Sequence, residues 1–157
     1  QPLVQIDVVD GEPPGDGRRH DRGERTDNIG QWQVVESGWL EPTGMSRWLQ
    51  CCDLCVLPFA DGLSLRRSTF MSAIAHGLPV VTTRPAQSFP GVESGENVIL
   101  VPPGDATSLS CAISQFAGSV PMRHDYGERV RQLSERFSWE ANAEATLALY
   151  HAVTDAG

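Results

Sequence analysis

The chain has 157 residues, 40% of them hydrophobic, and a formal net charge of −8. That length is enough for one domain with a hydrophobic core, while the acidic balance argues against a general nucleic-acid partner. The sequence contains no run of about 18 apolar residues, so it predicts no membrane span. The first residues have neither the basic start nor the apolar stretch of a secretory signal. We therefore expect a cytoplasmic protein.

Lysine is absent from the sequence, and all twelve basic residues are arginine. Walker-type phosphate loops, Schiff-base enzymes and Ser-x-x-Lys hydrolases each depend on a lysine. The sequence therefore excludes these three classes of protein. A flavodoxin-like receiver domain is disfavoured for the same reason, because it needs a lysine beside its clustered aspartates.

Three of the four cysteines, Cys51, Cys52 and Cys55, lie close together in the sequence, and Cys111 stands alone. Cys52 and Cys55 have the C-x-x-C spacing, but no second pair is present to complete a zinc site. The pair also falls between a helix end and a strand, whereas a redox motif opens a helix. We expect buried small hydrophobic residues in a reducing compartment, and no metal site.

Strand-like and helix-like segments alternate along the chain. A first strand is expected at 3–9. The polar, glycine-rich segment 10–31 is expected to be a long loop or a poorly formed helix. The later expected elements are strand 32–38, helix 41–52, strand 54–59, helix 65–76, strands 79–83 and 97–101, and helices 106–117, 125–137 and 139–153.

The segment LCVLPF at 54–59 is continuously apolar, as in a strand buried on both faces of a parallel sheet. Strands that alternate with helices predict an α/β fold, here one Rossmann-like three-layer domain with a mostly parallel sheet. Within that sheet, 54–59 and 79–83 are expected to be neighbouring parallel strands.

Local signals define several helix ends. Ser64 is a plausible N-cap of helix 65–76, Gly77 a left-handed terminator, and Asp105 the cap of helix 106–117. His76 lies at a helix end, where a structural role is favoured over a catalytic one. Trp139 is expected to pack the last helix onto the sheet.

The stretch DGLSLRRSTF at 61–70 places Arg66 and Arg67 near the expected start of a helix. An arginine is mildly unfavourable there, because the helix dipole is positive at that end. A phosphate or diphosphate would satisfy the arginines and the free N–H groups together. The alternative is that both arginines point into solvent as part of a charged face.

Several motifs follow one another in order: MSRWLQCCDLCVLPFADGLSL, MSAIAHGLPVVTT, GENVILVPPGD and FSWEANAEATLALY. In this order they resemble the C-terminal, nucleotide-sugar-binding half of the GT-B glycosyltransferases, specifically the retaining group 1 family, from Val34 to Tyr150. The resemblance implies carbohydrate biosynthesis from a nucleoside-diphosphate sugar such as a UDP-sugar. It also implies retained configuration and no bound metal or other cofactor.

The donor loop of this family has the pattern E-G-F-G-L, and a helix with E-A-M-A-x-G-x-P-V-V follows it. The resemblance places Asp61 at the first acidic position and Ser72 where relatives hold the ribose with a second acid. A register that keeps the family spacing would instead put Ser64 at the first position. The residues so implied to bind the donor are Asp61, Gly62, Leu63, Ser64, Leu65, Arg66, Arg67, Ser68, Thr69 and Ser72. The family loop that matches SGEN makes Glu93, Gly95 and Glu96 second-rank candidates.

Two features of the family are not found in the sequence. One is the first strand and loop with a G-R…K pattern, whose cations neutralise the diphosphate, so Arg66 and Arg67 are candidates to replace them. The other is the N-terminal acceptor-binding half with its usual catalytic histidine. We expect 1–157 to be a donor-binding domain that is inactive alone, because one half cannot position an acceptor.

Such a domain needs the missing acceptor domain or a partner chain, and its exposed cleft face is expected to promote self-association. The alternative is a degenerate, non-catalytic domain that binds a nucleotide or another anion. The loss of the second acid at Ser72 favours that alternative.

Overall fold

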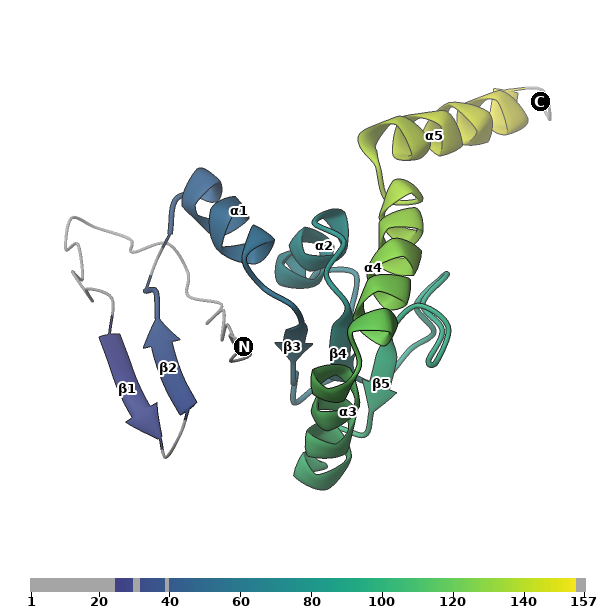
Figure 1. Ribbon diagram of the computed structural model, residues 1–157. Coiled ribbons are helices and arrows are strands. Elements are labelled where there is room, and N and C mark those ends of the chain that lie inside the picture. Colours follow the sequence, from purple (N-terminus) through teal and green to yellow (C-terminus); the bar gives the residue numbers. More distant parts are fainter. Residues whose placement is uncertain (1–24, 30–31, 39, 155–157) are drawn as a thin grey trace.

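The computed structural model describes residues 25–29, 32–38 and 40–154 of the chain (Figure 1). The expected strand 3–9 lies outside the described residues. The described elements are β1 (Arg25–Ile29), β2 (Trp32–Glu36), α1 (Pro42–Gln50), β3 (Cys55–Leu57), α2 (Ser68–Ala75), β4 (Val80–Thr83), β5 (Ile99–Val101), α3 (Ala106–Gly118), α4 (Val120–Glu135) and α5 (Trp139–Thr154).

A three-stranded parallel sheet with the order β3-β4-β5 forms the centre of the fold. Cys55 pairs with Val80, and Val81 pairs with Ile99. The prediction that 54–59 and 79–83 contain neighbouring parallel strands is therefore confirmed. Every residue of β3 and β4 is buried, as the continuous apolar runs predicted.

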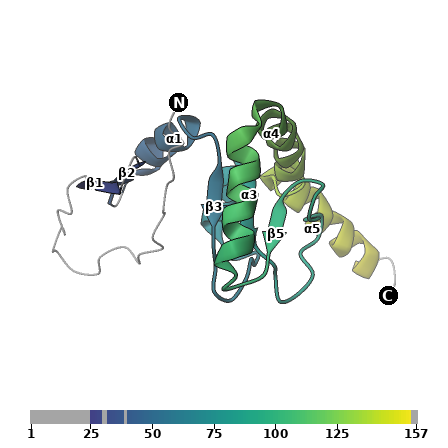
Figure 2. The same ribbon diagram turned by 60° about the horizontal axis from the view of Figure 1, so that its bottom comes forward.

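Helices cover both faces of this sheet, which confirms the α/β, Rossmann-like fold (Figure 2). Alternate strand residues point to opposite faces. Cys55, Leu57 and Val80 pack in one hydrophobic cluster with residues of α1, α2 and α4. Val56 and Val81 pack in a second cluster with the α3 side chains and with Tyr126.

The prediction of a loop for 10–31 is wrong for Arg25–Ile29, which forms β1, while the rest of that segment lies outside the described residues. β1 pairs antiparallel with β2, from Arg25 opposite Glu36 to Ile29 opposite Trp32. β1 carries only one apolar residue, so hydrophobic periodicity did not reveal it. This two-stranded sheet is separate from the three-stranded one.

Hydrogen-bonded caps set the starts of α3 and α4. Asp105 accepts from the Ser108 N–H at 2.9 Å, which confirms its predicted role, and the bonds from Ser108 lower the pKa of Asp105. Ser119 accepts from the Met122 N–H at 3.2 Å and starts α4 five residues before the predicted helix 125–137. A proline within the first turn of a helix needs no acceptor, which permits this early start.

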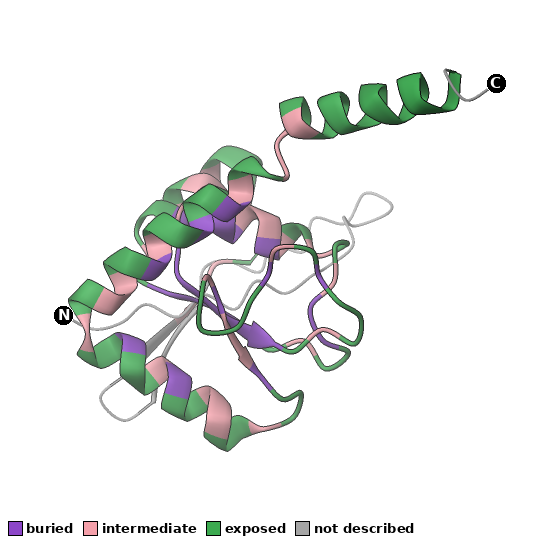
Figure 3. Ribbon diagram, turned by 90° about the vertical axis from the view of Figure 1, so that its right-hand side faces the viewer, coloured by how far each residue is buried: buried purple, intermediate pink, exposed green. Residues whose placement is uncertain are grey.

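Trp139 does not pack α5 onto the sheet, so that prediction is wrong. Trp139 is 88% exposed, and α5 contains no buried residue. Figure 3 shows α5 projecting from the rest of the described structure. Phe137, just before α5, packs edge-to-face on Phe89 instead, with ring centroids 5.8 Å apart.

All four cysteines are free, and only Cys55 is fully buried. Burial raises the pKa of Cys55 to about 12 and that of the half-buried Cys52 to about 11. Cys51 and Cys111 are exposed, so the expectation of four buried cysteines is wrong for these two. Both lie on or beside the outward face of a helix rather than in the sheet.

The loop after β3 crosses the end of β4 at very short range. Gly62 has a φ of +83°, and a Cβ atom at this position would overlap the carbonyl oxygen of Arg84. Neither the left-handed backbone nor this contact tolerates a side chain. Glycine is therefore required at this position by the packing of the loop itself.

Thiol labelling tests the burial of the cysteines. At neutral pH we expect iodoacetamide to modify Cys51 and Cys111 quickly in the folded chain, because they are exposed. Cys55 should react only on unfolding, and the half-buried Cys52 should react much more slowly than Cys51, since their raised pKa values leave few thiolates. Peptide mass spectrometry measures this, and equal rates for Cys55 and Cys51 would contradict the fold.

Substitution of Gly62 tests the crossing of the loop over β4. Gly104 is the matched control, because it also has a positive φ but a Cβ atom there would meet no atom within 4 Å. We expect Gly104→Ala to cost about 1–2 kcal/mol for the left-handed backbone. Gly62→Ala should cost about 1–3 kcal/mol more, for the overlap with Arg84. Equal losses in urea denaturation would show that the close approach is absent.

Candidate functional site

The candidate site lies at the carboxyl edge of the parallel sheet, where ligands bind in open α/β folds. Hydrogen bonds join the chain segments that leave the three strands. The Leu63 N–H donates to the Thr83 carbonyl at 3.1 Å, and the Thr83 hydroxyl donates to the Phe59 carbonyl at 2.7 Å. The Arg84 N–H donates to the Val101 carbonyl at 2.8 Å. The backbone beneath the site is therefore fixed.

Helix α2 begins at Ser68, three residues later than predicted, and its N-cap is Arg67. The predicted cap at Ser64 is wrong, because the Ser64 carbonyl instead accepts from the Arg67 N–H at 3.1 Å and closes a turn. Within the described part of the chain, no side chain accepts a hydrogen bond from the first N–H groups of α2. These groups point out of the positive end of the helix.

Arg67 lies across the face of this loop. Its guanidinium contacts the Asp61 carboxylate at 2.5 Å and lies 4.4 Å from the centroid of the Phe59 ring. The Arg67 side chain is 25% exposed and that of Asp61 is 72% exposed. Arg66 is exposed, so the two arginines differ in burial, and both precede the first residue of α2.

The hydroxyl residues near this helix start differ in accessibility. Ser68 is exposed, while Ser64 and Thr69 are half-buried. The Thr69 hydroxyl oxygen is buried and has no hydrogen-bond partner among the described residues. An unpaired buried hydroxyl is uncommon in a folded protein and calls for an explanation.

The remaining residues implied to bind the donor occupy different environments. Leu63 is buried in the core, and only its backbone faces the loop, whereas Leu65 is 57% exposed. Gly62 is fixed by its contact with Arg84. Ser72 lies one turn into α2, and its carbonyl is hydrogen-bonded to the ring of His76.

Arg84 belongs to this edge and was missed by the sequence analysis. It follows β4 directly, its carbonyl lies against Gly62, and its side chain is exposed. An arginine immediately after the run PVVTT was the signal that could have revealed it. Arg84 thus lies at the same end of the sheet as the loop that contains Asp61, Arg66 and Arg67.

The second-rank candidates lie elsewhere. Glu93, Gly95 and Glu96 precede β5, and Ser94 bridges Val98, so they approach the amino edge of the sheet. Asp61 follows β3 at the carboxyl edge. The structure therefore does not bring the two sets of predicted residues together.

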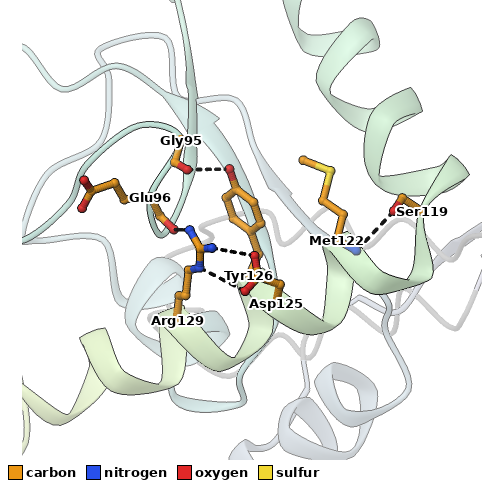
Figure 4. Close-up of polar contacts among 7 residues, drawn as sticks. All are labelled: Gly95, Glu96, Ser119, Met122, Asp125, Tyr126 and Arg129. Carbon is orange, nitrogen blue, oxygen red and sulfur yellow. Dashed lines mark hydrogen bonds and ion pairs between the residues drawn. The ribbon is translucent and has the colours of Figure 1, made fainter.

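Side chains of helix α4 hold the loop at 93–97 by hydrogen bonds to the backbone carbonyls of that loop (Figure 4). The Tyr126 hydroxyl donates to the Gly95 carbonyl at 2.9 Å, and burial raises the pKa of Tyr126. Arg129 donates to the Glu96 carbonyl at 2.8 Å and pairs with Asp125 at 2.8 Å. The Glu96 carboxylate points away from Arg129 in this view, so the contacts organise the loop rather than its acid.

His76 has a structural role, as predicted. Its Nδ1 lies 2.8 Å from the Ser72 carbonyl, so this nitrogen carries the proton, and its Nε2 lies 2.8 Å from the Ser46 hydroxyl. Gly77, with a φ of +68°, ends the helix as expected. The ring thereby joins the end of α2 to α1.

Two hollows lie away from the candidate site. One of about 360 Å³ is at the amino edge, between the ends of α1 and α2 and the start of α4, and includes His76, Arg123 and His124. The other, of about 440 Å³, lies between α4 and the loop at 91–97. Among residues 25–29, 32–38 and 40–154, no three His, Cys, Asp or Glu side chains gather as metal ligands. No helix in that part of the chain could span a membrane.

Comparisons with known proteins agree with this architecture. The family described as Glycosyl transferases group 1 matches residues 13–119. A D-inositol 3-phosphate glycosyltransferase of Kribbella flavida is 26% identical over 154 residues, which are 94% of this chain and 35% of that enzyme. The enzyme of the same name from Corynebacterium jeikeium is 32% identical over 87 residues, 55% of this chain and 21% of that enzyme.

An exopolysaccharide phosphotransferase of Streptomyces coelicolor is 36% identical over 89 residues, which are 54% of this chain and 9% of that protein. The chain thus spans about a third or less of the length of these relatives. The family match itself covers more than half of the chain and includes β3, the loop with Asp61 and Arg67, and the whole of α3. The chain therefore belongs to the group 1 glycosyl transferases.

Proposed function

We propose that this chain binds the nucleoside-diphosphate sugar donor of a retaining glycosyltransferase, as the C-terminal half of a GT-B fold. Membership of the group 1 family supports the use of a sugar donor. The observation that carries the proposal is the start of α2, which no side chain caps within the described residues and which lies beside Arg67. Together they form a positive site for a diphosphate at the edge where ligands bind.

Each group at this edge has a role in the proposed complex. The N–H groups of Ser68 and Thr69 bind phosphate oxygens, and Arg67 and Arg84 neutralise the charge. Guanidinium groups suit this task because each can donate two parallel hydrogen bonds to a phosphate. Arg66 faces solvent or the acceptor-binding part of the enzyme. The Thr69 hydroxyl gains a partner by rotating toward the ligand.

The transfer reaction needs more than the described site. The relatives are about three times longer than this chain or more. We propose that the present residues bind the donor and that an acceptor-binding domain or partner chain completes the active site, since positioning of both substrates supplies much of the rate. No residue of this chain is assigned as a catalytic group, and no metal is required for donor binding.

A second candidate function is a non-catalytic domain that binds a nucleotide or another anion. Ser72 favours it, because the resemblance places an acid there in active relatives and a serine makes only neutral hydrogen bonds. The two functions share the same phosphate site. They differ in whether a complete protein that contains this domain transfers sugar.

Substitution of Arg84 tests the phosphate site. We expect Arg84→Gln to weaken binding of UDP by roughly ten- to a hundredfold, because one charge-assisted contact is lost. Arg136→Gln is the control, since Arg136 is also exposed but lies after α4, beside the second hollow. Calorimetry measures both variants. Equal weakening would mean that net charge, rather than position, sets the affinity.

Assays of sugar transfer test the proposal that this chain binds the donor and that another domain binds the acceptor. We expect the isolated chain to bind UDP or GDP but to transfer no sugar from the matching donors to inositol phosphates or simple glycosides. Restored transfer on fusion to an acceptor-binding domain would favour the enzyme over the non-catalytic alternative. Turnover by the isolated chain with any acceptor would overturn the assignment of a donor-binding half.

A further inference from the structure

We propose that the Asp61 carboxylate takes the place of the donor diphosphate in the unliganded chain. It forms an ion pair with Arg67, and the diphosphate displaces it on binding. The inference rests on the proposed function and adds a step to it. The Asp61 carboxylate and Arg67 guanidinium are 2.5 Å apart. A carboxylate and a phosphate present the same kind of oxygen pair to a guanidinium.

The pair is asymmetric, which determines which partner moves. Arg67 is anchored, because it lies over the Phe59 ring and its side chain is only 25% exposed. Asp61 is 72% exposed and lies in the loop, one residue before Gly62. The carboxylate can therefore leave into solvent while the guanidinium keeps its position. This answers why an arginine is placed at the start of a helix: it is neutralised locally until a ligand arrives.

A diphosphate binds this site better than Asp61 does, because it can reach both parts of it. Asp61 contacts the guanidinium, but no side chain in the described ranges accepts from the first N–H groups of α2. Exposed Arg–Asp pairs contribute little to stability and are screened by salt. A ligand with several phosphate oxygens can accept from the helix N–H groups and from Arg67 at the same time.

The exchange also gives Asp61 a second role. Once Arg67 holds the phosphate, the released carboxylate is an acceptor beside the ligand. The groups of a nucleoside-diphosphate sugar that can donate to it are the hydroxyls of the ribose and of the transferred sugar. Pyrophosphate has none of these groups. The same residue should therefore oppose binding of pyrophosphate and favour binding of the donor.

Asp61→Asn tests the exchange by calorimetry with pyrophosphate, UDP and UDP-glucose. We expect pyrophosphate to bind about two- to fivefold more tightly, because an exposed ion pair no longer competes. UDP-glucose should bind roughly tenfold more weakly, because charge-assisted bonds to its hydroxyls are lost. If the hydroxyls of the transferred sugar donate hydrogen bonds to Asp61, UDP should bind Asp61→Asn more tightly, as pyrophosphate does. If the ribose hydroxyls donate them, UDP should bind more weakly, as UDP-glucose does.

Asp125→Asn is the matched control, since it also removes one negative charge and one Arg–Asp ion pair, with Arg129 on α4. The effect of Asp61→Asn on pyrophosphate should also shrink in an Arg67→Gln background, because the two side chains act as a pair. Equal effects of Asp61→Asn and Asp125→Asn, or equal tightening of all three ligands, would overturn the exchange. A parent chain that binds no nucleotide at all would instead overturn the proposed function.

Discussion

The arrangement of the carboxyl edge depends on one close approach, between Gly62 and the carbonyl of Arg84. Because Gly62 has no side chain, the loop after β3 can lie across the end of β4, where the Leu63 N–H bonds to Thr83. That contact places Leu63 in the core and fixes the turn that contains Arg66 and Arg67. Arg84 is held from the other side by its own N–H bond to Val101. The geometry of the proposed diphosphate site thus follows from packing that exists without a ligand.

Strong local signals allowed the central fold to be predicted from the sequence. The apolar runs at β3 and β4 can be buried only between two helical layers, so their pairing followed from composition. Asp105 and Gly77 have backbone roles that few other residues can fill, and both were predicted correctly. β1 was missed because Arg25–Ile29 is mostly polar and is paired by backbone bonds to β2. Trp139 was misplaced because an aromatic residue next to a helix start does not reveal whether anything covers it.

The sequence singled out the segment of the candidate site but did not predict its local structure. The segment 61–70 was singled out from its arginines, and the structure places it after β3, at the carboxyl edge of the sheet. The start of α2 could not be predicted, because the turn from Ser64 to Arg67 competes locally with helix and depends on contacts with β4. Arg84 was missed for the same reason: its proximity to Gly62 is a tertiary contact between segments more than 20 residues apart. Glu93, Gly95 and Glu96 were grouped with the site by resemblance, yet they approach the opposite edge.

The central claim is that a nucleoside diphosphate binds at the start of α2 and beside Arg84. Backbone amide NMR during a titration with UDP tests it most directly, because it locates the ligand without any substitution. We expect the largest shifts at Gly62, Arg67–Thr69 and Arg84, with small shifts at Gln50, Arg123 and His124. Shifts confined to the amino-edge hollow, around Gln50, Arg123 and His124, would contradict the account.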